Sequence, residues 1–325
     1  MSRKGITFGN IYDIFILIIV FIISMIISPL YIEGDQKVYI EVYEEISSLP
    51  IATSFLFYTY YMTSREIFHF LYIYFASTII DKDIAMSLIN ALTAFLASRI
   101  FRKAGLNYFL IFLIVVTSYY SLVLYFAAER LKFGFLFFLL GMNLGLTRFS
   151  GKAVLLMSIF GHLQMFFYIF GLAILSALDN FSLMIKRSVL NTGFLFAMFG
   201  ALLLFGLIVQ VGILGIVIEK LRFYILNAEI VDSLILLILG TASVVLAEKK
   251  DTKLIACLFI ALLAGSFLIG GDRLNMMAYF VTVYFLGKNI RALIFLIFPI
   301  TIYTIFKSII FMENILSHGH GFSIT

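Results

Sequence analysis

Long apolar runs, separated by short polar clusters, recur from one end of the chain to the other. A run of about 20 apolar residues crosses a bilayer as a helix, whereas barrel strands alternate over about 10 residues. The pattern therefore predicts an all-α polytopic membrane protein, a bundle of about 10–11 transmembrane helices. The expected spans are about 12–31, 84–98, 108–127, 133–147, a pair within 153–178, and then 192–218, 230–247, 254–270, 274–287 and 292–312.

Composition supports the membrane class and excludes several others. Hydrophobic residues make up 63% of the chain and charged residues 13%, against about 25% charged in soluble domains. The single cysteine, Cys257, rules out a disulfide framework and a cysteine metal site. Neither a Walker loop nor a dinucleotide fingerprint occurs, so nucleotide hydrolysis is not expected. The net charge of +5 reflects basic residues in short loops and indicates topology, with no nucleic-acid partner.

Basic residues in short loops also give the expected orientation, because such loops stay in the cytoplasm. Arg3 and Lys4 place the N-terminus inside. The chain is expected to form a single integral membrane domain, 1–325. Residues 32–83 are expected to be an outer amphipathic segment after the first helix, and residues 219–229 an outer loop.

The segment 153–178 has two interpretations. As one helix it would put Lys186 and Arg187 outside and invert the later basic loops, such as "EKKDTK" at 248–253. As a re-entrant or tightly turned pair with its tip near 161–162, it keeps those loops inside. Short arms of this kind occur where the backbone is buried in protein. The turned pair, with arms of about 10–16 residues, is therefore predicted.

Several charges lie at the expected outer ends of helices, where the positive-inside rule does not explain them. Arg130 follows Glu129 before one helix, and Arg273 follows Asp272 before another. Either arginine can simply extend its head group to the membrane surface. The alternative is an anion clamp, because a guanidinium fork matches phosphate oxygens and stays charged when buried.

Two further patterns are candidate sites. His162, in "IFGHLQMF", is either a hydrogen-bonded structural group or a site residue at membrane depth. Asp35, Tyr39 and Tyr43 are spaced i, i+4, i+8 and would share one helix face. They are either part of a solvated loop or a sugar-binding wall of a carboxylate and two aromatic rings. Lys220 and Arg222 lie in the outer loop.

The order of these features resembles the EpsG/Wzy-like polysaccharide polymerases. The resemblance rests on the acidic, tyrosine-containing segment after the first helix, on Arg130 and His162, and on the Arg273-to-Tyr279 spacing near the end. It implies a GT-C-like bundle with a catalytic cleft facing the periplasm of a bacterial inner membrane. It implies transfer of a growing glycan from undecaprenyl diphosphate to the non-reducing end of a lipid-linked repeat unit. A chain-length regulator and a flippase are candidate partners.

In the reaction that the resemblance implies, arginines stabilise the leaving diphosphate and a base takes the acceptor proton. Arg130 and Arg273 are the expected clamp, with Lys220 and Arg222 as further contacts. The base stays open among Asp35, Glu129 and His162. The remaining candidate substrate contacts are Tyr39, Tyr43, Asp272 and Tyr279.

No metal or other cofactor is expected, because acidic clusters with cation-ligand spacing are absent from the sequence. Other functions remain open. A flippase or transporter would favour inverted repeats and midplane charges. An O-antigen ligase would favour a longer late outer loop, and a membrane acyltransferase would use His162 with an acyl donor.

Overall fold

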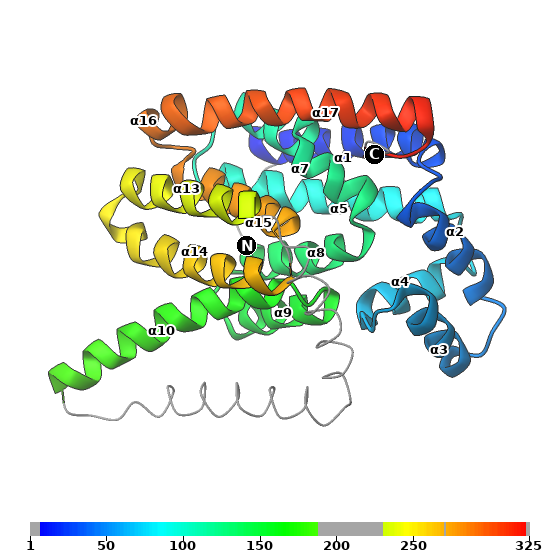
Figure 1. The fold of residues 1–325 in the computed structure, drawn as a ribbon, viewed down its shortest axis with the longest axis horizontal. Coiled ribbons are helices and arrows are strands. Elements are labelled where there is room, and N and C mark those ends of the chain that lie inside the picture. Colours follow the sequence, from blue (N-terminus) through cyan, green and yellow to red (C-terminus); the bar gives the residue numbers. More distant parts are fainter. Residues whose placement is uncertain (1–6, 188–229, 270, 323–325) are drawn as a thin grey trace. The chain divides into compact units, whose positions relative to one another are not determined.

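The computed structural model describes residues 7–187, 230–269 and 271–322, and every regular element in these ranges is a helix (Figure 1). The predicted all-α class is therefore confirmed for the described residues. The chain divides into two compact units, Met1–Met165 with Ile294–Thr325, and Phe166–Leu293. The single membrane domain stays a prediction. The predicted helix 192–218 and the outer loop with Lys220 and Arg222 fall outside the described residues.

The first unit contains most of the helices. They are α1 Phe8–Ile27, the 3₁₀ turn η1 Ser28–Leu30, α2 Asp35–Ile46, α3 Ile51–Met62, α4 Ile67–Ala76, α5 Lys82–Lys103, α6 Tyr108–Phe112, η2 Leu113–Thr117, α7 Tyr119–Leu122, η3 Val123–Ala127, α8 Glu129–Leu144, α9 Phe149–Gly161 and α17 Phe298–His318. The second unit contains α10 Met165–Arg187, which begins at the last residue of the first, and α13 Ile230–Leu246, α14 Lys249–Ile269, α15 Asp272–Leu286 and α16 Ile290–Ala292. The segment η4, Leu293–Ile297, leads into α17.

Within the described residues, 3 helices are long and apolar enough to cross a membrane, or up to 4 if a bent pair counts as one span. The three are Phe8–Leu30, Lys82–Lys103 and Ile290–His318. Only 28% of the first and 22% of the last is buried. Their outward faces carry isoleucine and phenylalanine, which suits contact with lipid. The total of 10–11 spans stays a prediction.

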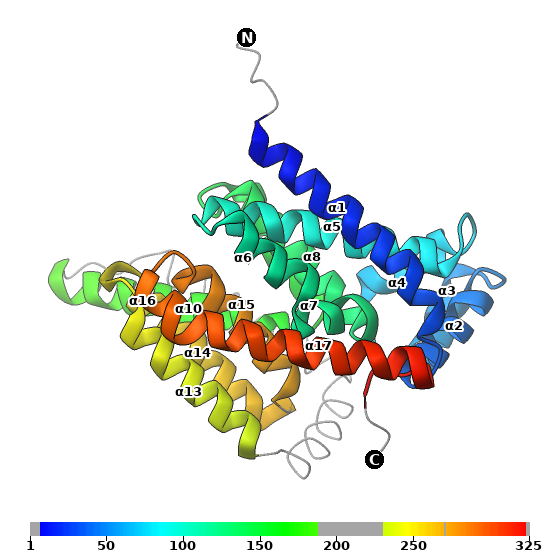
Figure 2. The same ribbon diagram turned by 90° about the horizontal axis from the view of Figure 1, so that it is seen from above.

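Helices α1 and α5 lie side by side (Figure 2) and share a buried ion pair. Asp13, 1% exposed, accepts from Arg102 through Nη2 at 2.5 Å and Nε at 3.3 Å, and from Ser98 Oγ at 2.8 Å. Both carboxylate oxygens are used, so the fork of the arginine matches the acid. The predicted span 84–98 was too short because it ended before the basic residues that follow Ser98. Since Arg102 is paired with Asp13, α5 continues to Lys103.

The predicted span 108–127 is broken. Ser118 is extended, with ψ of 143°, and the two halves meet at a bend of 48°. Two π-helical segments, η2 and η3, flank the short α7 between them. Ser118 Oγ and Ser121 Oγ donate to the carbonyl oxygen of Ile114, at 2.6 and 2.7 Å. These hydroxyls satisfy a backbone acceptor that the break leaves without a helical partner.

The predicted turn near residues 161–162 is confirmed. Helix α9 ends at Gly161, His162 is extended with ψ of 131°, and α10 starts at Met165. The arms are 13 and 23 residues long, so the second arm is longer than expected. Lys186 and Arg187 belong to α10 and do not form a loop.

Four helices begin earlier than predicted, at charged residues. They are α5 at Lys82, α8 at Glu129, α14 at Lys249 and α15 at Asp272. When spans are placed by the length of apolar runs, charged residues of this kind are assigned to loops. The first turn of a helix accepts charged side chains, especially acids, because its N–H groups point outward there. The expected helix at 230–247 matches α13 within one residue.

In the second unit, α13, α14 and α15 pack on one another. The close approach of α10 to α14 uses Gly171, where an added Cβ would lie 2.9 Å from Leu258 Cα. Tyr168 of α10 donates to the carbonyl oxygen of Met277 at 2.6 Å, which ties α10 to α15. These contacts fix the position of α15, which carries Arg273.

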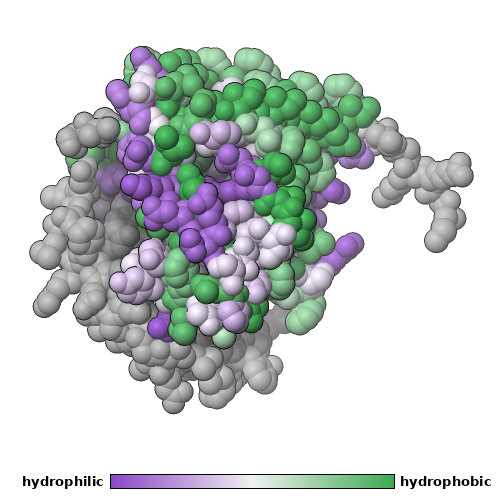
Figure 3. Space-filling view, turned by 90° about the vertical axis from the view of Figure 1, so that its right-hand side faces the viewer, coloured by the Kyte–Doolittle hydropathy of each residue, from purple (hydrophilic) through white to green (hydrophobic). Residues whose placement is uncertain are grey.

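The segment 32–83 forms α2, α3 and α4, and α2 is amphipathic as predicted. Val42 and Ile46 are fully buried, whereas the opposite side is polar. Figure 3 shows hydrophilic residues gathered on this face, bordered by hydrophobic surface. The exposed charged residues here are Glu33, Asp35, Lys37, Glu41, Glu44 and Glu45.

The pair of Asp13 and Arg102 gives a stability test. Asp13→Asn leaves a largely buried guanidinium without its carboxylate, and removing one partner of a buried pair costs about 3–5 kcal/mol. Because Arg102 is 23% exposed, we expect the lower end of that range. The measurement is the melting temperature in detergent, followed by circular dichroism.

A matched control is Glu248→Gln, in the exposed pair of Glu248 and Lys250, which should change the melting temperature little. The double variant Asp13→Leu with Arg102→Leu should melt above Asp13→Asn. A single variant as stable as the wild type would contradict this role for the pair.

Candidate functional site

The first unit contains a buried cluster of ionisable side chains from four separate segments. We call it the charge cluster. Its contacts connect the start of α4, the start of α5, the start of α8 and the turn after α9. Its members are Glu66, His69, Lys82, Glu129, Arg130 and His162, and their side chains are between 1% and 17% exposed.

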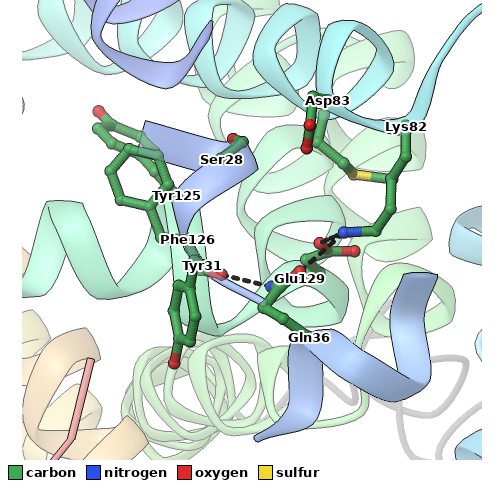
Figure 4. Close-up of a pocket in the computed structure, with 9 residues that line it drawn as sticks. Ser28, Tyr31, Gln36, Lys82, Asp83, Tyr125, Phe126 and Glu129 are labelled. Atoms are coloured by element: carbon green, nitrogen blue, oxygen red, sulfur yellow. Dashed lines mark hydrogen bonds and ion pairs between the residues drawn. The ribbon is translucent and has the colours of Figure 1, made fainter. Parts of the chain in front are cut away.

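One half of the cluster is built on Glu129. Lys82 Nζ lies 2.7 Å from Glu129 Oε1 and also donates to Gln36 Oε1 at 2.7 Å (Figure 4). Gln36 Nε2 in turn donates to the carbonyl oxygen of Phe126 at 2.5 Å. Burial raises the pKa of Glu129, but Lys82 and His69 outweigh it and hold the pKa well below its usual range. Glu129 is therefore ionised at neutral pH.

His69 completes this half. Tyr58 OH lies 2.9 Å from its Nδ1, and its Nε2 lies 3.9 Å from Glu129 Oε2. That separation is too long for a direct hydrogen bond. Neither Nε2 nor Oε2 has a hydrogen-bond partner among the described residues, and both atoms are buried. A ring nitrogen and a carboxylate oxygen thus face each other without a hydrogen bond between them.

The other half is built on Glu66. His162 Nε2 lies 3.2 Å from Glu66 Oε1, and Arg130 Nε lies 3.5 Å from Glu66 Oε2. The backbone N–H of Gln164 donates to His162 Nδ1 at 3.2 Å, so a neutral ring carries its hydrogen on Nε2, toward Glu66. Burial raises the pKa of Glu66, but His162 and Arg130 outweigh it and lower the pKa.

Arg130 is held on other sides as well. Its Nε donates to Tyr39 OH at 3.3 Å, and its Nη1 donates to the carbonyl oxygen of Met62 at 3.1 Å. Because α8 begins with Glu129 and Arg130, consecutive residues point into the two halves of the cluster. Glu66 and His69, three residues apart, do the same from the other side.

Glycines let His162 reach α8. An added Cβ on Gly134 would lie 3.0 Å from His162 Cβ, and one on Gly161 would lie 2.8 Å from the backbone nitrogen of Gly134. No other residue type permits this approach of α8 and α9 without a shift. The extended backbone at His162 then turns its ring toward Glu66.

Lys132, one turn after Glu129, extends the polar interior. It is fully buried, and its Nζ donates to Asn90 Oδ1 at 2.8 Å and to the carbonyl oxygen of Tyr125 at 2.6 Å. Asn90 Nδ2 donates to Ser24 Oγ at 3.1 Å, which links α8, α5 and α1. This ammonium is hydrogen-bonded only by neutral groups among the described residues.

A small pocket adjoins Glu129, with room for about one water molecule (Figure 4). Lys82, Gln36 and Glu129 line one part of it, and aromatic side chains, including those of Tyr31 and Phe126, line another. Carboxylate and amide oxygens accept hydrogen bonds from hydroxyls, and aromatic rings pack on apolar C–H faces. The lining therefore combines the two kinds of group that contact a sugar, although a sugar would enter only if the pocket opened.

The predicted site residues divide between the two units. Glu129, Arg130, His162 and Tyr39 all belong to the charge cluster or touch it. Asp35 is exposed at the first turn of α2, so it lies outside the cluster.

Tyr39 and Tyr43 do share one face of α2, as predicted, but that face is buried. They are 5% and 6% exposed, and Tyr43 OH donates to the carbonyl oxygen of Ile80 at 3.0 Å. The three residues Asp35, Tyr39 and Tyr43 therefore do not form an open wall.

Asp272, Arg273 and Tyr279 lie on α15 of the second unit. Asp272 is exposed, Arg273 is half-buried and Tyr279 is 1% exposed. Arg273 makes no ion pair with any residue that the structure describes. The predicted convergence of Arg130, His162 and Arg273 stays a prediction.

Sequence reasoning missed half of the cluster. Glu66, His69 and Lys82 fall in the segment 32–83, which was interpreted as an outer amphipathic stretch. A signal was present in "REIFHFLYIYF", where the acid and the histidine are three residues apart at the start of an apolar helix.

Comparison with known proteins gave no relative. No protein-family model matches the chain, and neither a curated protein nor a solved structure is a match.

The lowered pKa values of Glu66 and Glu129 predict a pH dependence of stability. Each is more acidic in the folded protein than the usual value of 4.5. Their ionised forms therefore stabilise the fold fully above that pH, and the contribution is lost as the pH falls. The double variant Glu66→Gln with Glu129→Gln should be less stable at pH 7 and lose less melting temperature between about pH 5 and pH 3.

The measurement is the melting temperature in detergent over that pH range. The matched control is the double variant Glu41→Gln with Glu44→Gln, which removes two exposed acids from α2 and should follow the wild-type curve. An equally steep loss in the cluster variant would show that these carboxylates do not couple folding to protonation.

Proposed function

We propose that the protein is a metal-independent membrane glycosyltransferase of the EpsG/Wzy-like type, a polysaccharide polymerase. It transfers a growing glycan from undecaprenyl diphosphate to the non-reducing end of a lipid-linked repeat unit. The observation that carries the proposal is the convergence of Arg130 and His162 on one buried carboxylate, Glu66, beside the pair of Glu129 and His69. The anion-binding group, Arg130, and one member of the proton-accepting pair, Glu129, are then adjacent residues of α8.

The leaving group determines the role of Arg130. Breaking the glycosidic C1–O bond leaves negative charge on the diphosphate oxygens. A preplaced guanidinium stabilises that charge most when it develops, in the transition state. Arg273 and the basic residues of the 219–229 loop are proposed as further contacts of the diphosphate.

The acceptor hydroxyl needs a proton acceptor, and the two halves of the cluster differ in this respect. His162 directs its Nε2 hydrogen at Glu66 and uses Nδ1 for a backbone N–H. His69 Nε2 and Glu129 Oε2 are both without a hydrogen-bond partner among the described residues. We assign the proton-accepting role to this pair. Glu129 orients the hydroxyl, and His69, whose ring is neutral because burial lowers its pKa below the usual value, takes the proton.

The pocket beside Glu129 is the proposed place of the acceptor sugar. Lys82 and Gln36 would contact its hydroxyls, and Tyr31 and Phe126 its C–H faces. The hydroxyl oxygen attacks C1 as its proton passes to the His69–Glu129 pair. The bond from C1 to the diphosphate oxygen breaks, and undecaprenyl diphosphate leaves.

The membrane setting completes the proposal. Both substrates carry isoprenoid tails, which suits a bundle of about 10–11 spans with a GT-C-like cleft. We propose a location in the bacterial inner membrane, with the N-terminus in the cytoplasm and the charge cluster toward the periplasm. A flippase and a chain-length regulator would act before and beside it.

The activity test uses purified protein in vesicles with lipid-linked repeat units. We expect a ladder of longer lipid-linked glycans without an ion gradient, and Arg130→Ala should slow it by about 10²–10³-fold. Arg130→Lys should restore little, because an ammonium lacks the fork. Arg148→Ala, at an exposed arginine, is the matched control and should retain activity.

The alternatives give other outcomes. A flippase would relocate the substrate without lengthening it, and a ligase would act only with lipid A core as acceptor. Full activity of Arg130→Ala at normal protein levels would eliminate the proposed clamp.

Orientation has its own test. Reporter fusions after Lys250 should score cytoplasmic, and fusions after Glu45, on the polar face of α2, should score periplasmic. The same score at both positions would contradict the proposed topology.

A further inference from the structure

The position of Glu66 suggests a role beyond that of a structural acid. We infer that the Glu66 carboxylate occupies the anion site formed by Arg130 and His162, so that a diphosphate binds there only when Glu66 leaves. This inference rests on the proposed function and adds to it a built-in competitor for the ligand. The ligand class is a diphosphate ester.

The ion pairs of Glu66 are longer than the shortest contacts of Glu129 and Asp13, which are 2.7 and 2.5 Å. Arg130 Nε and His162 Nε2 lie 3.5 and 3.2 Å from its oxygens, and Oε2 makes no hydrogen bond among the described residues. Charge-assisted hydrogen bonds in proteins are usually about 2.7–2.9 Å long. By contrast, Arg102 engages both oxygens of Asp13. The pair of Asp13 and Arg102 thus has one short contact of 2.5 Å, whereas Glu66 has none shorter than 3.2 Å to Arg130 or His162.

Arg130 also has more N–H donors than the described residues around it accept from. A guanidinium has five N–H groups. The acceptors around Arg130 are Tyr39 OH and Glu66 at Nε, and the carbonyl oxygen of Met62 at Nη1. No described residue accepts a hydrogen bond from Nη2. A diphosphate, with several oxygens on two phosphorus atoms, uses more of these donors than one carboxylate does.

The segment that carries Glu66 is strained. Thr63, between α3 and α4, has φ of +47°, a left-handed conformation that a β-branched residue rarely adopts. Such strain costs on the order of 1–3 kcal/mol and persists where the surroundings enforce it. Glu66 lies three residues later, before the first residue of α4. Movement of this short connection would release the strain and free the anion site together.

The test measures diphosphate binding by the full chain in phosphatidylcholine nanodiscs, using isothermal titration calorimetry. The probes are inorganic pyrophosphate and farnesyl diphosphate. The variant is Glu66→Gln, which removes the competing charge at constant shape. We expect it to bind both probes about tenfold more tightly, as expected for one charge-assisted contact.

Controls separate a local competitor from a general loss of negative charge. Glu44→Gln removes an exposed acid from α2 of the same unit, and it should change the Kd less than about twofold because solvent and salt screen it. Glu66→Asp keeps the charge on a shorter side chain and should show a smaller gain. If Glu66→Gln does not fold, the Asp variant still decides the direction.

Unchanged or weaker binding by the Glu66 variants would overturn the inference, as would an equal gain in Glu44→Gln. Tighter binding of both probes supports a site for the shared diphosphate group. A gain with farnesyl diphosphate only also supports it and limits the ligand to lipid-linked diphosphates. The glycan ladder of the wild type is scored separately. If the wild type elongates the glycan but Glu66→Gln does not bind the diphosphates more tightly, only the competitor role of Glu66 is refuted. If Glu66→Gln binds more tightly but the wild type does not elongate the glycan, only the polymerase function is refuted.

Discussion

The ion pair of Lys82 and Glu129 is the constraint on which the first unit depends. A buried carboxylate without a cation is strongly destabilising, so the starts of α5 and α8 have to meet. Gln36 shares the ammonium and binds the end of the broken segment before α8, which adds α2 to the same junction. The next residue, Arg130, then contacts Tyr39 of α2, the end of α3 at Met62 and Glu66 before α4.

That geometry explains how two different chemistries fit in a small volume. Glu129 and Arg130 are consecutive in α8, and Glu66 and His69 lie one turn apart at the start of α4. In each pair, one residue belongs to the half of the cluster around Glu129 and the other to the half around Glu66. A guanidinium and a carboxylate–histidine pair are therefore brought into one buried cluster.

Glycine is as important here as charge. His162 reaches the cluster because α8 and α9 approach each other at Gly134 and Gly161, where a side chain would collide with backbone. The close approach of α8 and α9 thus places His162 beside Glu66. In a lipid environment, where helices gain little from burying apolar surface, such close backbone contacts are a main source of association.

The sequence by itself determined the class of the protein and much of its helical order. Apolar length fixed where helices occur, since a span must satisfy its own backbone groups, and Gly161 with His162 marked a real turn. Charged helix starts were misplaced because hydropathy treats a paired and an unpaired charge alike. The unusual setting of three charged or titratable residues made them candidates, namely Glu129, Arg130 and His162. The sequence did not show which residues they contact.

Only the tertiary structure decided the partners. Glu66, His69 and Lys82 stand in a segment that looks like a polar outer stretch, and nothing local shows that they face α8. Hydrogen bonds between residues 46 to 96 positions apart depend on how helices cross, which periodicity does not encode. The same is true of Tyr39 and Tyr43, whose spacing predicted a shared face but not that α3, α4 and α5 would cover it.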